Sequence, residues 1–168
     1  MRSLCVWTDA KFFILAVVSV FTFQSCKKDH SDADRDKALF NEATAAGFTY
    51  YQNGAVLTGV SPSPHGDFVL RVNATAASAL DSTGELPVGA SFPTGSIIVK
   101  ELRHGSHIHQ LVIRKKDPSN SASGAGWLWA EDETSGVTTF STAKKGDGCI
   151  SCHSGTPNRD LTRTYDLH

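Results

Sequence analysis

The sequence predicts an α+β fold, in which a mostly antiparallel β-sheet is flanked by a few short helices. Short runs of β-branched and aromatic residues recur along the chain, and the strongest of them span 67–72, 96–102, 107–114 and 127–130. Turn-rich segments with glycine or proline separate these runs, and helical periodicity is confined to short stretches.

The N-terminal part of this domain is expected to be helical and then extended. Residues 37–46 fit one helix, with Leu39 and Phe40 as its main apolar anchors. The aromatic and β-branched residues within 50–56 suggest an early strand, which ends at the turn-rich segment 61–66.

The central elements follow from alternation and capping. Residues 67–72 alternate as a strand does, and Asn73 is a plausible N-cap for a short helix through residue 80. The strands at 96–102 and 107–114 are expected to pair as a hairpin around Gly105.

The segment 149–153 reads Cys-Ile-Ser-Cys-His, which is the attachment signature of a c-type haem. Cys149 and Cys152 lie on one helical turn, so each thiol can add to a vinyl group of the same porphyrin. His153 then reaches the iron from the proximal side. A disulfide or half of a zinc site is the alternative, but zinc needs two more ligands at paired spacing. We therefore expect the sheet to enclose one covalently attached haem c.

The first 25 residues resemble an export leader. Arg2 and Lys11 supply positive charge, and the apolar run 12–23 is too short to span a bilayer. Ser25 precedes Cys26 as in a loose lipobox, which predicts lipidation of Cys26 and a protein anchored to a bacterial membrane, facing the periplasm or cell surface. An ordinary cleaved signal peptide with an incidental cysteine is the alternative.

The domain plan and the cysteine count agree with export. Residues 26–36 read as a charged tether and 37–168 as the haem domain. Of the four cysteines, Cys5 is removed with the leader and the other three have the roles given above, so none is left for a disulfide. The formal charge of −1 and the lack of a long basic run argue against nucleic-acid binding.

The amino-acid composition does not identify the sixth ligand of the haem iron. Met1 is the single methionine and lies in the leader, so a His/Met haem is excluded. His65 sits in a turn near the sheet edge and is one candidate ligand. A cluster near the hairpin offers either a distal ligand, a separate metal site or plain surface histidines, and it comprises His104, His107 and His109.

Four blocks together resemble the cytochrome P-460 family, which includes the cytochromes c′-beta. The blocks are Arg-Val-Asn at 71–73, Phe-Pro-Thr-Gly-Ser-Ile-Ile-Val-Lys-Glu at 92–101, Gly-Trp-Leu-Trp at 126–129, and the haem motif. The resemblance runs from about residue 55 to the C-terminus. It implies a sheet-rich fold around one high-spin haem with an open distal position. It also implies a homodimer, although no apolar stripe in the sequence requires one.

The resemblance implies two chemistries. Cytochromes P-460 oxidise hydroxylamine, pass electrons to an external acceptor and carry a lysine linked to the porphyrin; Lys100 matches that lysine. Cytochromes c′-beta lack the link and bind gases such as nitric oxide. A periplasmic electron-transfer cytochrome with a filled sixth position is the third hypothesis.

The residues themselves leave the choice between these chemistries open. Lys100 shares a strand face with Ile98 and Leu102, so its amine is either buried with a lowered pKa or reaches water from an apolar stem. The family's distal carboxylate is missing from 137–146. Three acids lie earlier and are expected to form a solvated turn; they are Glu131, Asp132 and Glu133. Trp127 and Trp129 pack either on the porphyrin or as ordinary core.

Overall fold

The computed structural model describes residues 31–61 and 63–166, so the leader and Cys26 lie outside the described residues. Its centre is a seven-stranded sheet in the order β1-β3-β4-β5-β6-β7, with β2 paired to β3 and every pair antiparallel. The strands are β1 (Thr49–Tyr50), β2 (Leu57–Thr58), β3 (Asp67–Val72), β4 (Ile97–His104), β5 (His107–Lys116), β6 (Trp127–Glu133) and β7 (Thr138–Phe140). The predicted α+β class is confirmed.

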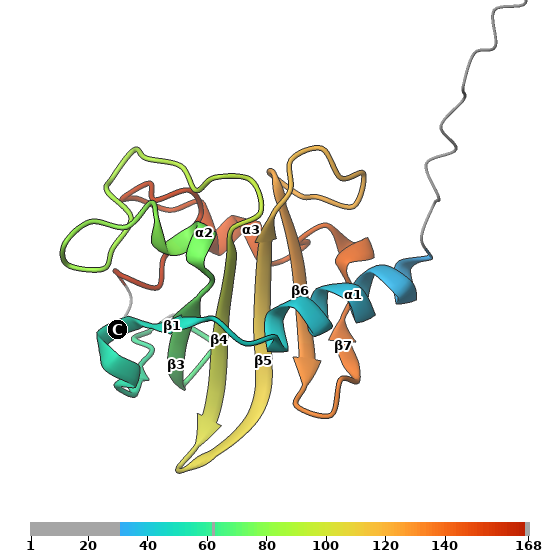
Figure 1. Cartoon of the computed structure of the whole chain (residues 1–168), viewed down its shortest axis with the longest axis horizontal. Coiled ribbons are helices and arrows are strands. Elements are labelled where there is room, and N and C mark those ends of the chain that lie inside the picture. The colour runs from blue at the N-terminus through green and yellow to red at the C-terminus, as the bar shows by residue number, and fades with distance from the viewer. Residues whose placement is uncertain (1–30, 62, 167–168) are drawn as a thin grey trace, which may run out of the picture.

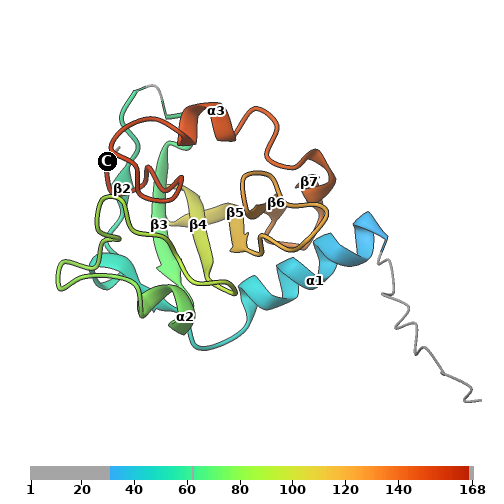
Figure 2. The same cartoon turned by 90° about the horizontal axis from the view of Figure 1, so that it is seen from above.

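Three short α-helices and two 3-10 turns flank the sheet (Figure 1). They are α1 (Asp32–Thr44), η1 (Tyr51–Gly54), α2 (Ala74–Ala77), η2 (Thr142–Lys144) and α3 (Ile150–His153). In the view along the sheet, α1 and α3 lie on opposite faces (Figure 2). No helix within the described ranges is long and apolar enough to cross a membrane.

The two faces of the sheet bury separate apolar clusters. The α1 face carries Leu39 and Ala43 of the helix against a second group from the strands, namely Val99, Leu111, Ile113, Leu128 and Ala130. The α3 face buries a larger cluster, which includes Phe68, Leu70, Ile98, Leu102, Trp127 and Trp129 and packs against Cys149 and Ile150. Alternate residues of each strand therefore serve different cores.

The β4–β5 hairpin forms as predicted, with His104 opposite His107 across the turn at Gly105. Strand β3 has the predicted bounds, and Asn73 caps α2 by accepting a hydrogen bond from the Ala76 amide at 2.9 Å. The helix ends at Ala77, earlier than expected. The expected early strand is interrupted by η1, where Gln52 has a φ of 46°.

Helix α1 begins at Asp32 rather than at residue 37, so residues 32–36 of the expected tether are helical. Ser31 is the N-cap and accepts from the Asp34 amide, which supplies a helix start inside the polar run. Asp36 is buried, and its carboxylate accepts from the Thr142 amide at 2.9 Å and from the Thr142 hydroxyl at 2.6 Å. Helix α1 thereby holds η2, the segment that leads to Cys149.

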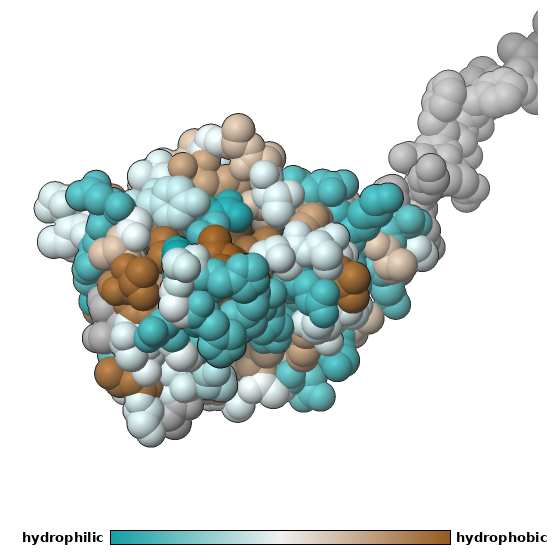
Figure 3. Space-filling model, turned by 90° about the horizontal axis from the view of Figure 1, so that it is seen from below, coloured by the Kyte–Doolittle hydropathy of each residue, from teal (hydrophilic) through white to brown (hydrophobic). Residues whose placement is uncertain are grey.

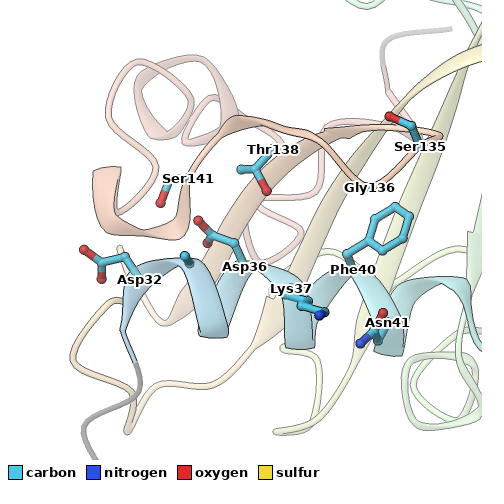
Figure 4. Close-up of a pocket in the computed structure, with 10 residues that line it drawn as sticks. Asp32, Asp36, Lys37, Phe40, Asn41, Ser135, Gly136, Thr138 and Ser141 are labelled. Carbon is cyan, nitrogen blue, oxygen red and sulfur yellow. The ribbon is translucent and has the colours of Figure 1, made fainter.

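An open groove of about 630 Å³ runs between α1 and the β6–β7 turn. In Figure 4, Asp36 points from α1 toward Thr138 and Ser141, whereas Lys37 points away from them. Among the residues that the structure describes, the exposed large apolar side chains do not come from a single element; they are Tyr50, Val56, Val60, Val88 and Val137. The face drawn in Figure 3 likewise shows apolar patches separated by polar residues.

Asp36→Ala should lower the free energy of unfolding by about 2–4 kcal/mol, because it removes two buried charge-assisted hydrogen bonds and leaves the Thr142 amide unpaired. Urea denaturation followed by circular dichroism measures this loss. Asp32→Ala is the matched control, since the Asp32 side chain is 62% exposed and its pair with Arg35 is worth about 1 kcal/mol or less. Equal losses in the two variants would contradict the role given to Asp36.

Candidate haem site

The two cysteines of the motif lie at one turn of the short helix α3. Cys149 is the N-cap residue and packs partly buried against the α3 face, whereas Cys152 is exposed. Both are free thiols. Burial raises the pKa of the Cys149 thiol, and Glu131 raises it further. Two unpaired thiols on one turn, beside an apolar wall, fit thioether attachment of a porphyrin.

His153 ends α3 and is held on two sides. Its ring packs edge-on against Trp129, with the ring centres 5.2 Å apart and the planes at 77°. Its Nδ1 lies 2.7 Å from the Leu161 carbonyl oxygen. A carbonyl only accepts, so Nδ1 carries the hydrogen and Nε2 keeps its lone pair. In this tautomer Nε2 is the ring nitrogen available to bind a metal ion, and the hydrogen bond at Nδ1 fixes the ring.

The charge on His153 also suits iron binding. Burial lowers the pKa of His153 to about 3, and the positive charge of Arg114 lowers it further, against the effect of the hydrogen bond to Leu161. The imidazole is therefore neutral at physiological pH. A neutral ring with a free Nε2 is the form that coordinates a haem iron.

The tryptophans line the α3 face beside His153. Trp127 is fully buried and meets Phe92 edge-on at 5.7 Å. Trp129 is 3% exposed, donates its Nε1–H to the Gly124 carbonyl at 3.0 Å and contacts the His153 ring. Both belong to the core, and Trp129 also positions the expected iron ligand.

Lys100 is buried in the same face, so of the two alternatives the buried amine is correct and the water-reaching ammonium is wrong. It is 9% exposed, and its Nζ lies 4.5 Å from the centre of the Phe68 ring. Burial lowers the pKa of Lys100 to about 7, Arg114 adds to this, and Cys152 opposes it. A large fraction of the amine is unprotonated at neutral pH, as a nucleophilic amine must be.

The expectation of a solvated acidic turn at 131–133 is wrong, because β6 continues through these residues. Val112 of β5 pairs with Lys100 on one side and with Glu131 on the other, so Lys100 and Glu131 share the α3 face. Glu131 is half-buried and accepts from Gln110 Nε2 at 3.0 Å; burial raises its pKa. Asp132 points to the α1 face and is fully buried.

Sequence reasoning missed the position of Glu131 although the signal was present. The alternation of Trp127 and Trp129 extends by one more step to residue 131. Three consecutive acids after Ala130 suggest that the strand ends there only if those residues are assumed to face solvent. Here both faces of β6 are covered.

The histidine candidates for the sixth iron ligand lie in two different parts of the structure. His65 is half-buried in the turn before β3, and burial lowers its pKa to about 4, with the charges of Lys100 and Arg114 adding to the effect. His104 and His109 stack at 4.2 Å near the hairpin tip, which lies at the other end of the sheet from α3 (Figure 1). Within the described part of the chain, no cluster of three His, Cys, Asp or Glu residues could hold a metal ion.

The free thiols, the neutral imidazole and the apolar wall lie together in one α+β domain, which is the arrangement expected of a haem-binding protein. A family model described as Cytochrome P460 matches residues 42–164, which is most of the chain. The chain belongs to the cytochrome P460 family, and a haem cofactor follows from that membership. A comparison with curated proteins found no match.

Lys100→Met should make the unfolding free energy less dependent on pH. The folded-state pKa of about 7 lies below the usual value of 10.5, so burial of Lys100 destabilises the wild type fully below pH 7 and progressively less up to about pH 10.5. The variant should gain about 3–5 kcal/mol at pH 6 and little at pH 10. Urea denaturation at pH 6, 8 and 10 tests this; parallel curves for both proteins would show that the amine does not titrate as a free buried group.

Proposed function

We propose that the protein is an exported, mono-haem c-type cytochrome with an open distal position for small nitrogen compounds. Cys149 and Cys152 hold the haem covalently, and His153 is the proximal ligand. The observation that carries the proposal is the state of His153, whose Nδ1 donates to Leu161 while Nε2 is free, on the same turn as the two thiols.

Haem iron supplies, when bound, a coordination position for a small ligand and a one-electron redox centre. The chain supplies the orientation and the surroundings. Trp129 and the Leu161 carbonyl fix the plane of the His153 ring. The apolar cluster of the α3 face excludes water from the neighbourhood of Lys100.

We propose hydroxylamine oxidation as the first candidate activity, with Glu131 as the group that accepts protons. Its carboxyl group shares a sheet face with Lys100, and its raised pKa makes it a stronger base than an exposed glutamate. The lowered pKa of Lys100 makes the unprotonated amine available, which is the form that could replace a hydrogen at the porphyrin edge. That substitution releases two protons and two electrons, so it would need an external two-electron oxidant such as a peroxide. Electrons from the substrate would pass to an external acceptor.

Nitric oxide binding without turnover is the second candidate, favoured by the apolar residues around Lys100. The electron-transfer alternative requires a protein side chain in the sixth position, and His65 is the histidine whose charge interacts with both Lys100 and His153. Lipidation of Cys26 would place any of these activities at a membrane surface outside the cytoplasm, and a homodimer remains a proposal from the resemblance.

Covalent attachment is tested by extracting the purified protein with acidified acetone. The haem should stay on the polypeptide, and a tryptic map should place it on the peptide that contains residues 149–153. Replacing both cysteines by alanine should release it into the organic layer. Release of all haem from the wild type would rule out the c-type assignment, and the same map reports any adduct of Lys100.

Glu131→Gln should reduce hydroxylamine oxidation by about 10²–10⁴-fold, since the amide cannot accept a proton, while haem content and nitric oxide binding stay normal. Glu133→Gln is the matched control, because Glu133 is on the same strand but exposed. Stopped-flow reduction of an artificial acceptor gives the rates. A wild type that binds nitric oxide rapidly and does not turn over hydroxylamine would favour the second candidate.

The ferric protein should give a high-spin electron paramagnetic resonance spectrum that changes when cyanide is added. A low-spin spectrum insensitive to cyanide would instead indicate a filled sixth position. His65→Ala then discriminates further, because it should convert that spectrum to high-spin if His65 is the ligand. His107→Ala, at the exposed hairpin tip, is the control substitution.

A further inference from the structure

Arg114 is a buried cation without a carboxylate partner among the residues that the structure describes. It lies on β5, is 4% exposed, and its guanidinium carbon is 4.9 Å from the Trp127 ring centre and 5.1 Å from that of Trp129. Its Nη1 donates to the Leu161 carbonyl at 2.5 Å, and its Nη2 donates to the Thr162 hydroxyl at 2.8 Å. Burial of an unneutralised charge is costly.

The Leu161 carbonyl is shared between Arg114 and His153. It accepts the second hydrogen bond, at 2.7 Å, from Nδ1 of the expected iron ligand. The backbone there is unusual, because Asp160 and Leu161 have φ values of 51° and 63°. Asp160 is held by a pair with Lys116 at 2.7 Å. Several contacts therefore maintain a conformation that aims one carbonyl at both donors.

We propose that Arg114 is a positioning residue that fixes the Leu161 carbonyl and so sets how strongly His153 donates electrons to a bound haem iron. The inference rests on the proposed role of His153 as the proximal ligand. A carbonyl oxygen that already accepts from a guanidinium is a weaker acceptor for the Nδ1 hydrogen, so the imidazole keeps less negative character. The fixed positive charge acts in the same direction and favours the reduced state.

The test uses the full chain with haem attached. Arg114→Met should shift the ferrous-to-ferric equilibrium at least tenfold toward the ferric state, which corresponds to a reduction potential lower by at least about 59 mV for one electron. The iron–histidine stretching band of the ferrous protein, read by resonance Raman spectroscopy, should move to higher frequency. Arg114→Lys keeps the charge without the paired hydrogen bonds, so it should restore part of the potential and leave the band shifted.

Two further variants keep the test decisive. Thr162→Val removes one acceptor of the guanidinium, so it should shift the ferrous-to-ferric equilibrium about twofold toward the ferric state. This variant provides the test if Arg114→Met does not fold. Lys144→Met is the control for charge alone, because Lys144 is exposed, lies near Cys149 and has no contact with Leu161. It should leave the band unchanged.

The proposal is overturned by a folded Arg114→Met protein whose iron–histidine band is unchanged and whose equilibrium shifts less than twofold. An equal band shift in Lys144→Met would also overturn it, since charge alone would then suffice. A wild type without covalent haem is a separate outcome, which contradicts the proposed function. In that case ¹⁵N-histidine labelling still reports the Nδ1–H group of His153, whose hydrogen bond to Leu161 should strengthen in Arg114→Met. An Nδ1 chemical shift that is the same in Arg114→Met and in the wild type would overturn the positioning role.

Discussion

The central strands are covered on both faces, and this constraint shapes the rest of the molecule. Side chains alternate along a strand, so each residue of β4, β5 and β6 belongs either to the α1 face or to the α3 face. The α1 face closes as an ordinary apolar core under a helix. The α3 face receives the tryptophans together with Lys100, Arg114 and Glu131, and α3 closes over it. The alternation of side chains along the strands thus places the residues of the proposed site on one face of the sheet.

The two faces treat buried cations differently. On the α1 face, Arg71 pairs with Glu101 at 2.5 Å, so its charge is neutralised locally. On the α3 face, Lys100 contacts an aromatic ring, and Arg114 donates to a carbonyl and a hydroxyl. Burial lowers the pKa of His65 and of His153, and the positive charges of Lys100 and Arg114 lower both values further. Such an arrangement keeps two imidazoles neutral within a buried region.

Local signals account for what could be predicted. The alternation of residues 67–72 correctly predicted the bounds of β3, and Asn73, as an N-cap residue, correctly predicted the start of α2. The spacing within 149–153 predicts an attachment segment without any knowledge of the fold, and the family match supports the haem cofactor that this prediction requires. Lys100 was singled out by its apolar neighbours and by a resemblance, and its burial is consistent with both.

Long-range contacts account for what could not be predicted. Asp36 lies in a polar run, and its partner Thr142 is 106 positions away. The contacts of Leu161 could not be predicted, because they are made by a backbone carbonyl that any residue provides. The φ of 63° that orients this carbonyl has no sequence signal, since Leu161 is not a glycine. Glu131 differs from these residues, because it continues the alternation of Trp127 and Trp129 in the sequence. What the sequence did not show is that both faces of β6 are buried.

The contact between Asp36 and Thr142 bears on where this domain begins. The family match starts at residue 42, inside α1, and a boundary drawn there would discard Ser31, Asp36 and Leu39. The shortened chain would leave the apolar residues of the α1 face open to water and the amide of η2 without its acceptor. A fragment that keeps these contacts therefore has to begin at or before Ser31, 11 residues ahead of the start of the family match.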